Sequence, residues 1–150
     1  MYHAIVRRRV RALFDAVNRG NAAPVIAMIA GRFEHAFLGD HALGGSRRGL
    51  DATRAWYGRL WRLLPDLRFD LHRVQVAGPP WNTIVTAEWS ETNSGTDGVR
   101  TGNSGIHVLH LRWGRATRLL IATDTVALTA TLQRIARAGT AEALAPPILD

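Results

Sequence analysis

The length, composition and charge of the sequence are those of one soluble globular domain. The chain has 150 residues, of which 47% are hydrophobic and 21% are charged, which suits a single core. No apolar run approaches the roughly 20 residues of a membrane span, so we expect no membrane partner. The absence of cysteine excludes disulfides, thiolate metal sites and cysteine nucleophiles. The first arginines follow only a very short apolar stretch, the wrong order for a secretory signal, and we expect a cytoplasmic protein.

The basic charge comes entirely from arginine. All 19 basic residues are arginine and the formal net charge is +7, so Schiff-base chemistry on a lysine is excluded. Apart from four arginines within residues 7–11 and the Arg47–Arg48 pair, the arginines are scattered along the chain. Nucleic-acid binding calls for basic residues gathered on one face. We therefore expect no nucleic-acid partner.

Four segments are predicted to be helical. Apolar residues recur at the spacing of one helical face over residues 4–19, and a capping asparagine precedes a shorter helix over 22–30. A third helix over 50–64 carries a broad apolar stripe and ends at a proline. The last helix is predicted to run to about Arg137, with Asp124 or Thr125 as its N-cap. The tail, residues 139–150, is predicted to be irregular.

The remaining segments are predicted to form an antiparallel sheet. In a strand over 32–38, Phe33, His35 and Phe37 share one face because side chains alternate. Glycines predict a loop over 39–49. Four further strands follow, at 67–77, 83–91, 103–113 and 115–123. The order predicts an α+β fold in which helices cover the concave face of a strongly curved, cone-shaped sheet with an internal pocket.

This order of elements and three local strings resemble the nuclear transport factor 2-like superfamily, in particular its SnoaL-like branch of polyketide cyclase relatives. The strings are VNRGN, RRGLDATRAWYGRLWRLLPDLRF and HVLHLRWGRATRLLIATDT. The resemblance covers about residues 4–138 and implies one SnoaL-like domain over 1–150 that forms a homodimer. The superfamily includes isomerases, cyclases, epoxide hydrolases and pure binders, so the fold alone does not select an activity.

Several positions that are catalytic in such relatives hold other residues here. The resemblance places His35 where ketosteroid isomerases carry their aspartate base. It places His107 at the pocket histidine of polyketide cyclases in an ungapped alignment, and Leu109 there if a gap is allowed. The catalytic aspartate of cyclases and epoxide hydrolases corresponds to Ile121, which leaves only Asp124 nearby. Their acid/base mechanism is therefore not expected to operate unchanged.

Two further comparisons concern the third strand and the first helix. Limonene epoxide hydrolases carry an arginine and an aspartate where this chain has Trp89 and Glu91. The oxyanion-hole tyrosine of ketosteroid isomerases corresponds to Leu13, so steroid isomerisation is not expected.

Each candidate polar residue also has a purely structural interpretation. His35 can accept a proton at neutral pH, since a free imidazole has a pKa near 6.5, or it can be a core histidine bonded to a backbone carbonyl. Glu91 can face the pocket or lie at a solvated rim, and Asp124 is favoured as a helix cap. His107 is a pocket candidate. The sequence contains no HxH or HExxH spacing, so we expect no metal and no other cofactor.

The resulting hypothesis is a pocket that binds an apolar or aromatic small molecule. Catalysis, if present, would be cofactor-independent proton transfer such as isomerisation, cyclisation, elimination or hydrolysis, with His35 as base and His107, Glu91 and Asp124 as further catalytic candidates. The alternative is a ligand-binding module without turnover, or a dimeric scaffold. The candidate ligand-binding residues are Phe33, Phe37, Trp56, Tyr57, Leu60, Trp61, Trp89, Leu109, Leu120 and Ala122.

Overall fold

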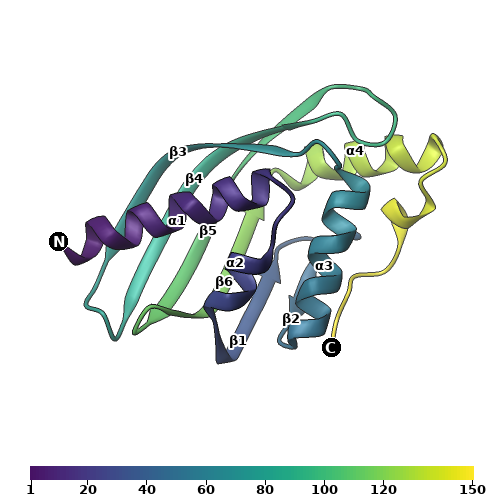
Figure 1. Ribbon diagram of the computed structural model, residues 1–150. Helices are drawn as coiled ribbons and strands as arrows, with labels where there is room; N and C mark the ends of the chain where they lie inside the picture. Colours follow the sequence, from purple (N-terminus) through teal and green to yellow (C-terminus); the bar gives the residue numbers. More distant parts are fainter.

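The computed structural model describes residues 1–150 (Figure 1) and contains the four expected helices. They are α1 (Tyr2–Asn18), α2 (Ala23–Met28), α3 (Leu50–Leu63) and α4 (Thr125–Arg137). The predicted second helix was too long, because the backbone at Ile29 is already extended and starts a strand. The tail is not irregular throughout, since it contains a short 3-10 helix, η1 (Ala141–Leu144). No helix is both long enough and apolar enough to cross a membrane.

The strands form one six-stranded sheet in the order β2-β1-β6-β5-β4-β3. Their bounds are β1 (Ile29–Phe37), β2 (Gly45–Arg47), β3 (Arg68–Ala77), β4 (Thr83–Asn93), β5 (Thr101–Arg112) and β6 (Arg115–Thr123). Two expectations were wrong. The predicted loop over 39–49 contains β2, which pairs with β1, and β1 runs parallel to β6 instead of antiparallel.

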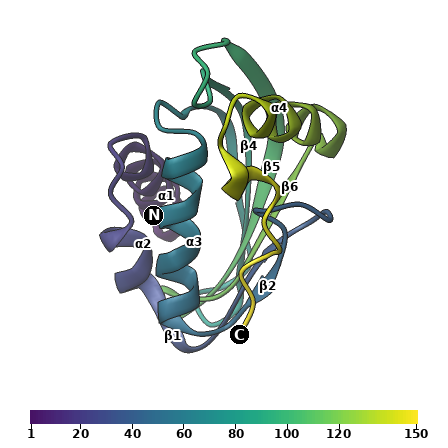
Figure 2. The same cartoon turned by 90° about the vertical axis from the view of Figure 1, so that its right-hand side faces the viewer.

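The sheet is strongly curved, and α1, α2 and α3 lie on its concave side (Figure 2). Register shifts between Leu71 and Arg73 and between His110 and Leu111 interrupt the pairing. Such bulges bend a strand and increase its twist. The mixed α+β cone expected from the sequence is therefore confirmed.

The helices meet the sheet through the apolar faces that their periodicity predicts. On α1 these buried side chains are Val6, Val10 and Phe14, and on α3 they include Trp56 and Leu60. α1 lies along β3, and its Asn18 side chain bonds the backbone of Phe69 through both amide atoms, at 2.9 and 2.7 Å. These two hydrogen bonds hold the end of α1 against β3, the edge strand of the sheet.

The C-terminal segment folds back against α3 and β2 (Figure 2). Glu142 accepts hydrogen bonds from Arg59 and Arg62 on α3. The Asp150 carboxylate accepts hydrogen bonds from the backbone N–H groups of Arg48 and Gly49, just before α3 begins. A carboxylate at a helix N-terminus is favourable for the helix dipole.

Candidate functional site

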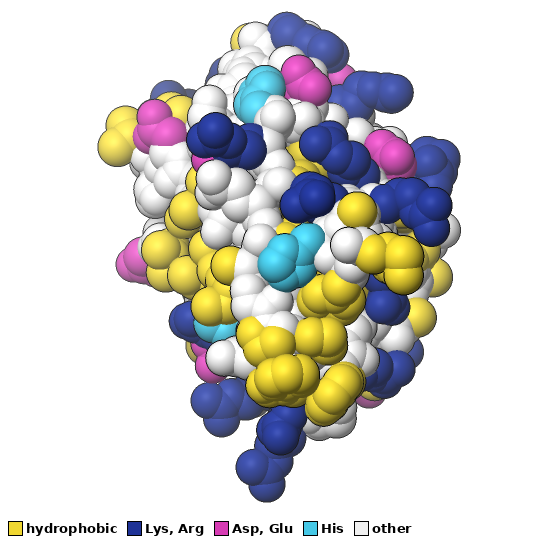
Figure 3. Space-filling model, turned by 90° about the vertical axis from the view of Figure 1, so that its left-hand side faces the viewer, with side chains coloured by type: hydrophobic (Ala, Val, Ile, Leu, Met, Phe, Trp, Pro, Cys, Tyr) yellow, Lys and Arg dark blue, Asp and Glu magenta, His cyan; other side chains and the backbone are white.

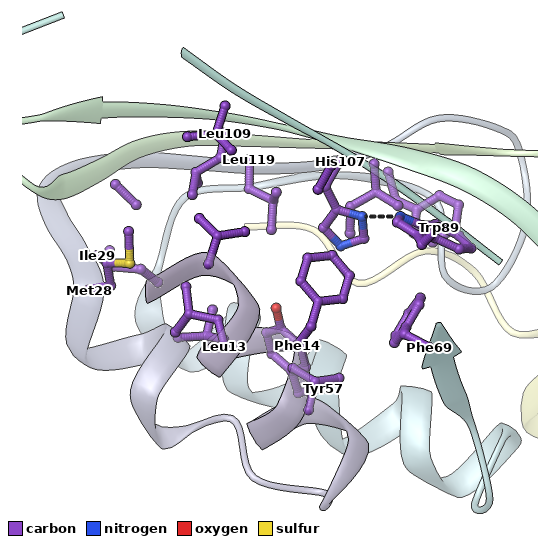
Figure 4. Close-up of a pocket in the computed structure, with 18 of the residues that line it drawn as sticks. Leu13, Phe14, Met28, Ile29, Tyr57, Phe69, Trp89, His107, Leu109 and Leu119 are labelled. Carbon is purple, nitrogen blue, oxygen red and sulfur yellow. Dashed lines mark hydrogen bonds between the residues drawn. The ribbon is translucent and has the colours of Figure 1, made fainter. Parts of the chain in front are cut away.

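A cavity of about 90 Å³ lies between the concave face of the sheet and α1, α2 and α3. This volume accommodates roughly six to nine water-sized groups, the size of a molecule with one or two rings. Of the 21 lining residues, 20 are hydrophobic and the remaining one is His107. Figure 4 shows His107 on the sheet side and Tyr57 and Phe14 opposite it.

Most of the ligand-binding residues expected from the sequence line this cavity. They are Phe33, Phe37, Trp56, Tyr57, Leu60, Trp89 and Leu109. Leu120 and Ala122 do not, because Leu119 and Ile121 point into the cavity and alternation sends their neighbours to the opposite face. Trp61 contacts Tyr57, with ring centroids 5.7 Å apart, but lies outside the lining.

The hydrogen bond at His107 fixes where its proton lies. Trp89 Nε1–H donates to His107 Nδ1 at 2.7 Å, and an indole nitrogen can only donate. The Nδ1 atom must therefore be unprotonated, and the neutral ring carries its hydrogen on Nε2. Burial lowers the pKa of His107 to about 3, so the ring is neutral at neutral pH. Its Nε2–H has no hydrogen-bond acceptor within the protein and is available to a ligand.

Tyr57 brings a second polar group to the cavity. Its hydroxyl oxygen points into the space between the helices and His107 (Figure 4). Burial raises the pKa of Tyr57 above its ordinary value, so the hydroxyl keeps its proton. It makes no hydrogen bond within the protein, unlike Tyr2, whose hydroxyl bonds Thr83.

His35 is completely buried and held by Arg47. Arg47 Nη1 donates to His35 Nδ1 at 2.6 Å, and a guanidinium can only donate, so His35 also carries its hydrogen on Nε2. That atom is buried without a hydrogen-bond partner. Burial, followed by the charge of Arg47, lowers the pKa of His35 to about 3. His35 therefore lacks the ordinary imidazole pKa from which its role as a base was argued.

Arg47 itself is a buried cation surrounded by neutral acceptors. Besides His35, it donates from Nη2 to the carbonyl oxygens of Gly44 at 2.7 Å and Gly45 at 3.0 Å, and from Nε to that of Ile148 at 2.9 Å. Burial lowers the pKa of Arg47 to about 10. Sequence reasoning missed this residue because Arg47 and Arg48 stood together in a predicted loop. The inward direction of Arg47 could have been predicted only if β2 and the alternation of its side chains had been recognised.

The two carboxylates expected near the pocket do not line it. Glu91 is buried on the concave face and accepts from Asn93 Nδ2 at 3.0 Å, and burial raises its pKa. Asp124 accepts hydrogen bonds from the backbone N–H groups of Val126 and Ala127, which confirms it as the N-cap of α4. No group of three or more histidine or acidic side chains is arranged to hold a metal ion.

The curved sheet, the helices on its concave face and the apolar cavity define a nuclear transport factor 2-like protein. The model of the SnoaL-like domain matches residues 10–119, so the chain belongs to the SnoaL-like domain family. No curated protein matches the sequence.

Solved structures with low sequence identity share the fold. An NTF2-like protein of unknown function from Burkholderia pseudomallei K96243 is 18% identical, with a TM-score of 0.75 over 83% of this chain and 95% of that one. A protein assigned as a SnoaL-like polyketide cyclase from Jannaschia sp. CCS1 is 17% identical, with a TM-score of 0.68 over 86% and 92%. TerC, crystallised with polyporic acid, is 16% identical, with a TM-score of 0.66 over 84% and 96%.

Proposed function

We propose that the cavity binds an apolar, ring-containing small molecule through a hydrogen-bond-accepting oxygen, and that it polarises this oxygen during cofactor-independent proton transfer such as isomerisation or cyclisation. The observation that carries the proposal is the pairing of two free polar groups in an otherwise apolar space. His107 offers an Nε2–H and Tyr57 offers a hydroxyl, and neither has a protein partner. Because neither donor is occupied within the protein, a carbonyl or enol oxygen of the ligand can accept from them in an apolar space, where a hydrogen bond is stronger than in water.

The neutral state of His107 suits this role. Because its pKa is lowered to about 3, the ring donates a hydrogen bond without carrying a charge. A neutral imidazole of this kind can polarise a carbonyl and stabilise the oxygen as negative charge develops. Tyr57 lies on the helix side of the cavity (Figure 4), and we infer that its hydroxyl donates to the same oxygen.

The proposal moves the chemistry away from His35. Its Nδ1 lone pair is occupied by Arg47, and its lowered pKa opposes proton uptake at neutral pH. No carboxylate lines the cavity. A water molecule therefore takes the proton that leaves the carbon next to the carbonyl and returns a proton to the product, and the protein contributes the polarisation of the carbonyl oxygen.

The relatives agree with a small-molecule function of this kind. One was crystallised with polyporic acid, and another is assigned as a polyketide cyclase. The homodimer that the family resemblance implies and the cytoplasmic location stay predictions.

Binding is tested with two ligands of nearly the same shape, acetophenone and α-methylstyrene, which has a methylene in place of the carbonyl oxygen. Titrations followed by tryptophan fluorescence should give tighter binding of acetophenone, by roughly threefold to tenfold for one net hydrogen bond. Tyr57→Phe should reduce that preference while leaving α-methylstyrene binding unchanged. Tyr2→Phe, outside the cavity, is the matched control. Equal binding of the two ligands by the unmodified protein would contradict the proposal.

Proton transfer is tested with the same ligand in deuterated water. Polarisation of the carbonyl should accelerate exchange of the acetophenone methyl hydrogens for deuterium, seen by proton NMR, and Tyr57→Phe should slow it. Preferential binding of acetophenone without accelerated exchange would identify a binding module without turnover.

A further inference from the structure

Two exposed tryptophans stand together at one end of the sheet, far from the cavity chemistry. Trp81 lies in the turn between β3 and β4, and Trp113 lies in the turn between β5 and β6. Their ring centroids are 5.8 Å apart, and the residues are 56% and 66% exposed. The backbone N–H of Trp113 donates to the carbonyl oxygen of Pro80 at 2.7 Å, so the two turns are held together.

The start of α1 completes this end of the molecule. The His3 ring is 2.8 Å from the carbonyl oxygen of Gly78 in the β3–β4 turn. Arg9 donates to the carbonyl oxygen of Gly114 in the β5–β6 turn at 3.1 Å. The helix and both turns therefore form one continuous surface.

The segments around the two turns carry only positive charge. Residues 1–11, 76–84 and 110–116, which build this surface, contain no aspartate or glutamate. Six exposed arginines in these segments take part in none of the ion pairs of the structure: Arg7, Arg8, Arg9, Arg11, Arg112 and Arg115. Figure 3, which faces this end, shows hydrophobic side chains gathered low on the surface with basic side chains beside them, and acidic side chains in the upper part and along the sides of the view. We name the two tryptophans and these six arginines the basic end.

The tryptophan side chains are not needed by the fold. Both rings are largely solvent-exposed and neither residue belongs to the hydrophobic core. Trp113 also has a φ of 52°, a left-handed conformation that is unfavourable for a bulky residue. A glycine or asparagine would serve the turn better.

We propose that the basic end docks onto an anionic lipid surface, with Trp81 and Trp113 at the level of the headgroups. Tryptophan favours the membrane interface because its ring is apolar and its N–H is polar. Arginines near an anionic bilayer add attraction that falls off within a Debye length. The rings stand at the tips of two turns instead of lining a groove, which suits insertion into headgroups better than the stacking platforms of single-stranded nucleic acid. This proposal departs from the expectation of no membrane partner, which was argued from the lack of a spanning segment, because peripheral docking needs no such segment.

The experiment measures binding of the whole protein to vesicles. Vesicles of phosphatidylcholine with phosphatidylglycerol should co-sediment with the protein, and vesicles of phosphatidylcholine alone should not. Raising the salt concentration should weaken binding, because it shortens the Debye length to ~3 Å at 1 M. Brominated lipids should quench tryptophan fluorescence on binding.

Two matched sets of variants test the residues. Trp81→Ser combined with Trp113→Asn should abolish quenching, and asparagine tolerates the positive φ. Arg112→Glu should lower vesicle affinity by roughly tenfold or more, since each basic residue near the surface contributes ~1 kcal/mol. Arg68→Glu is the control, because Arg68 is also exposed and makes no ion pair but lies at the other end of β3. It should bind as the unmodified protein does.

Three results would overturn the proposal. One is equal binding to neutral and anionic vesicles, or no binding to either. Another is a dimer in vesicle-free solution that dissociates in the tryptophan double variant, which would assign the basic end to a second copy. The third is tryptophan-dependent binding of oligothymidylate without vesicle binding.

Discussion

Two adjacent arginines show how strongly the environment of a residue determines its contribution to the stability of the fold. Arg47 is fully buried on β2 and donates to His35 and to three backbone carbonyl oxygens. Arg48 is the next residue, yet its side chain is 78% exposed and its ion pair with Glu34 is 3.6 Å long. The first is part of a buried hydrogen-bond network and the second is a surface charge.

We predict that Arg47→Met lowers the free energy of unfolding by at least ~2 kcal/mol, because it leaves buried acceptors without donors. Arg48→Met is the matched control and should change the free energy of unfolding by less than ~1 kcal/mol, as is usual for exposed ion pairs. Urea unfolding of both variants gives the comparison. An equal effect of the two substitutions would show that the Arg47 network does not stabilise the protein.

The same pair shows why part of the site could not be predicted from the sequence. Alternation correctly placed Phe33, His35 and Phe37 on one inward face, and periodicity placed Trp56 and Tyr57 on the buried face of α3. Whether the Nδ1 atom of His35 is free to accept a proton depends on Arg47. Arg47 reaches this atom only because β2 pairs with β1 at His35↔Arg47. Three residues within a glycine-rich segment give too little alternation to predict such a strand.

At the scale of elements, the helices and the hairpin strands could be predicted, because they form through interactions between residues close in the sequence. The long helices have apolar stripes and the hairpin strands have turn residues, and these elements are confirmed within a few residues. The direction of β1 against β6 could not be predicted in this way, because the two strands are joined through α3 and four other strands rather than by a turn. Their pairing depends on how the whole sheet closes.

Asp124 is an N-cap that was predicted from the local sequence, and its contribution to the free energy of unfolding can be measured. Its side chain accepts hydrogen bonds from two backbone N–H groups at the start of α4, at 3.0 and 3.1 Å. We predict that Asp124→Ala lowers the free energy of unfolding by about 1 kcal/mol, the usual loss for an N-cap. Asp51→Ala is the control, since Asp51 lies in the first turn of α3 but makes no capping hydrogen bond. Thermal unfolding should show a clearly larger shift for Asp124→Ala, and equal shifts would contradict the capping role.

At the scale of the whole molecule, the fold keeps two histidines neutral where they face or adjoin an apolar interior. His35 and His107 both have pKa values lowered to about 3, mainly by burial. In the unfolded chain a histidine has a pKa near 6.5. Above that pH both states are neutral and the two residues do not make stability depend on pH.

Below a pH of about 6.5 the unfolded chain takes up a proton on each of these histidines and the folded protein does not. The free energy of unfolding should therefore fall with decreasing pH, by ~1.4 kcal/mol per pH unit for each histidine, until the folded pKa values near 3 are reached. His41, whose pKa burial also lowers, acts in the same direction. Between pH ~6.5 and ~5 most carboxylates are ionised in both states, so the histidines dominate the slope.

His107→Gln isolates one of the two contributions. The amide oxygen can still accept the hydrogen bond from Trp89, and the side chain does not titrate. We predict that the slope between pH ~6.5 and ~5, measured by urea unfolding, becomes shallower by ~1.4 kcal/mol per pH unit. An unchanged slope in His107→Gln would mean that His107 takes up its proton at the same pH in the folded and unfolded protein, and burial would then not keep the ring neutral below pH ~6.5.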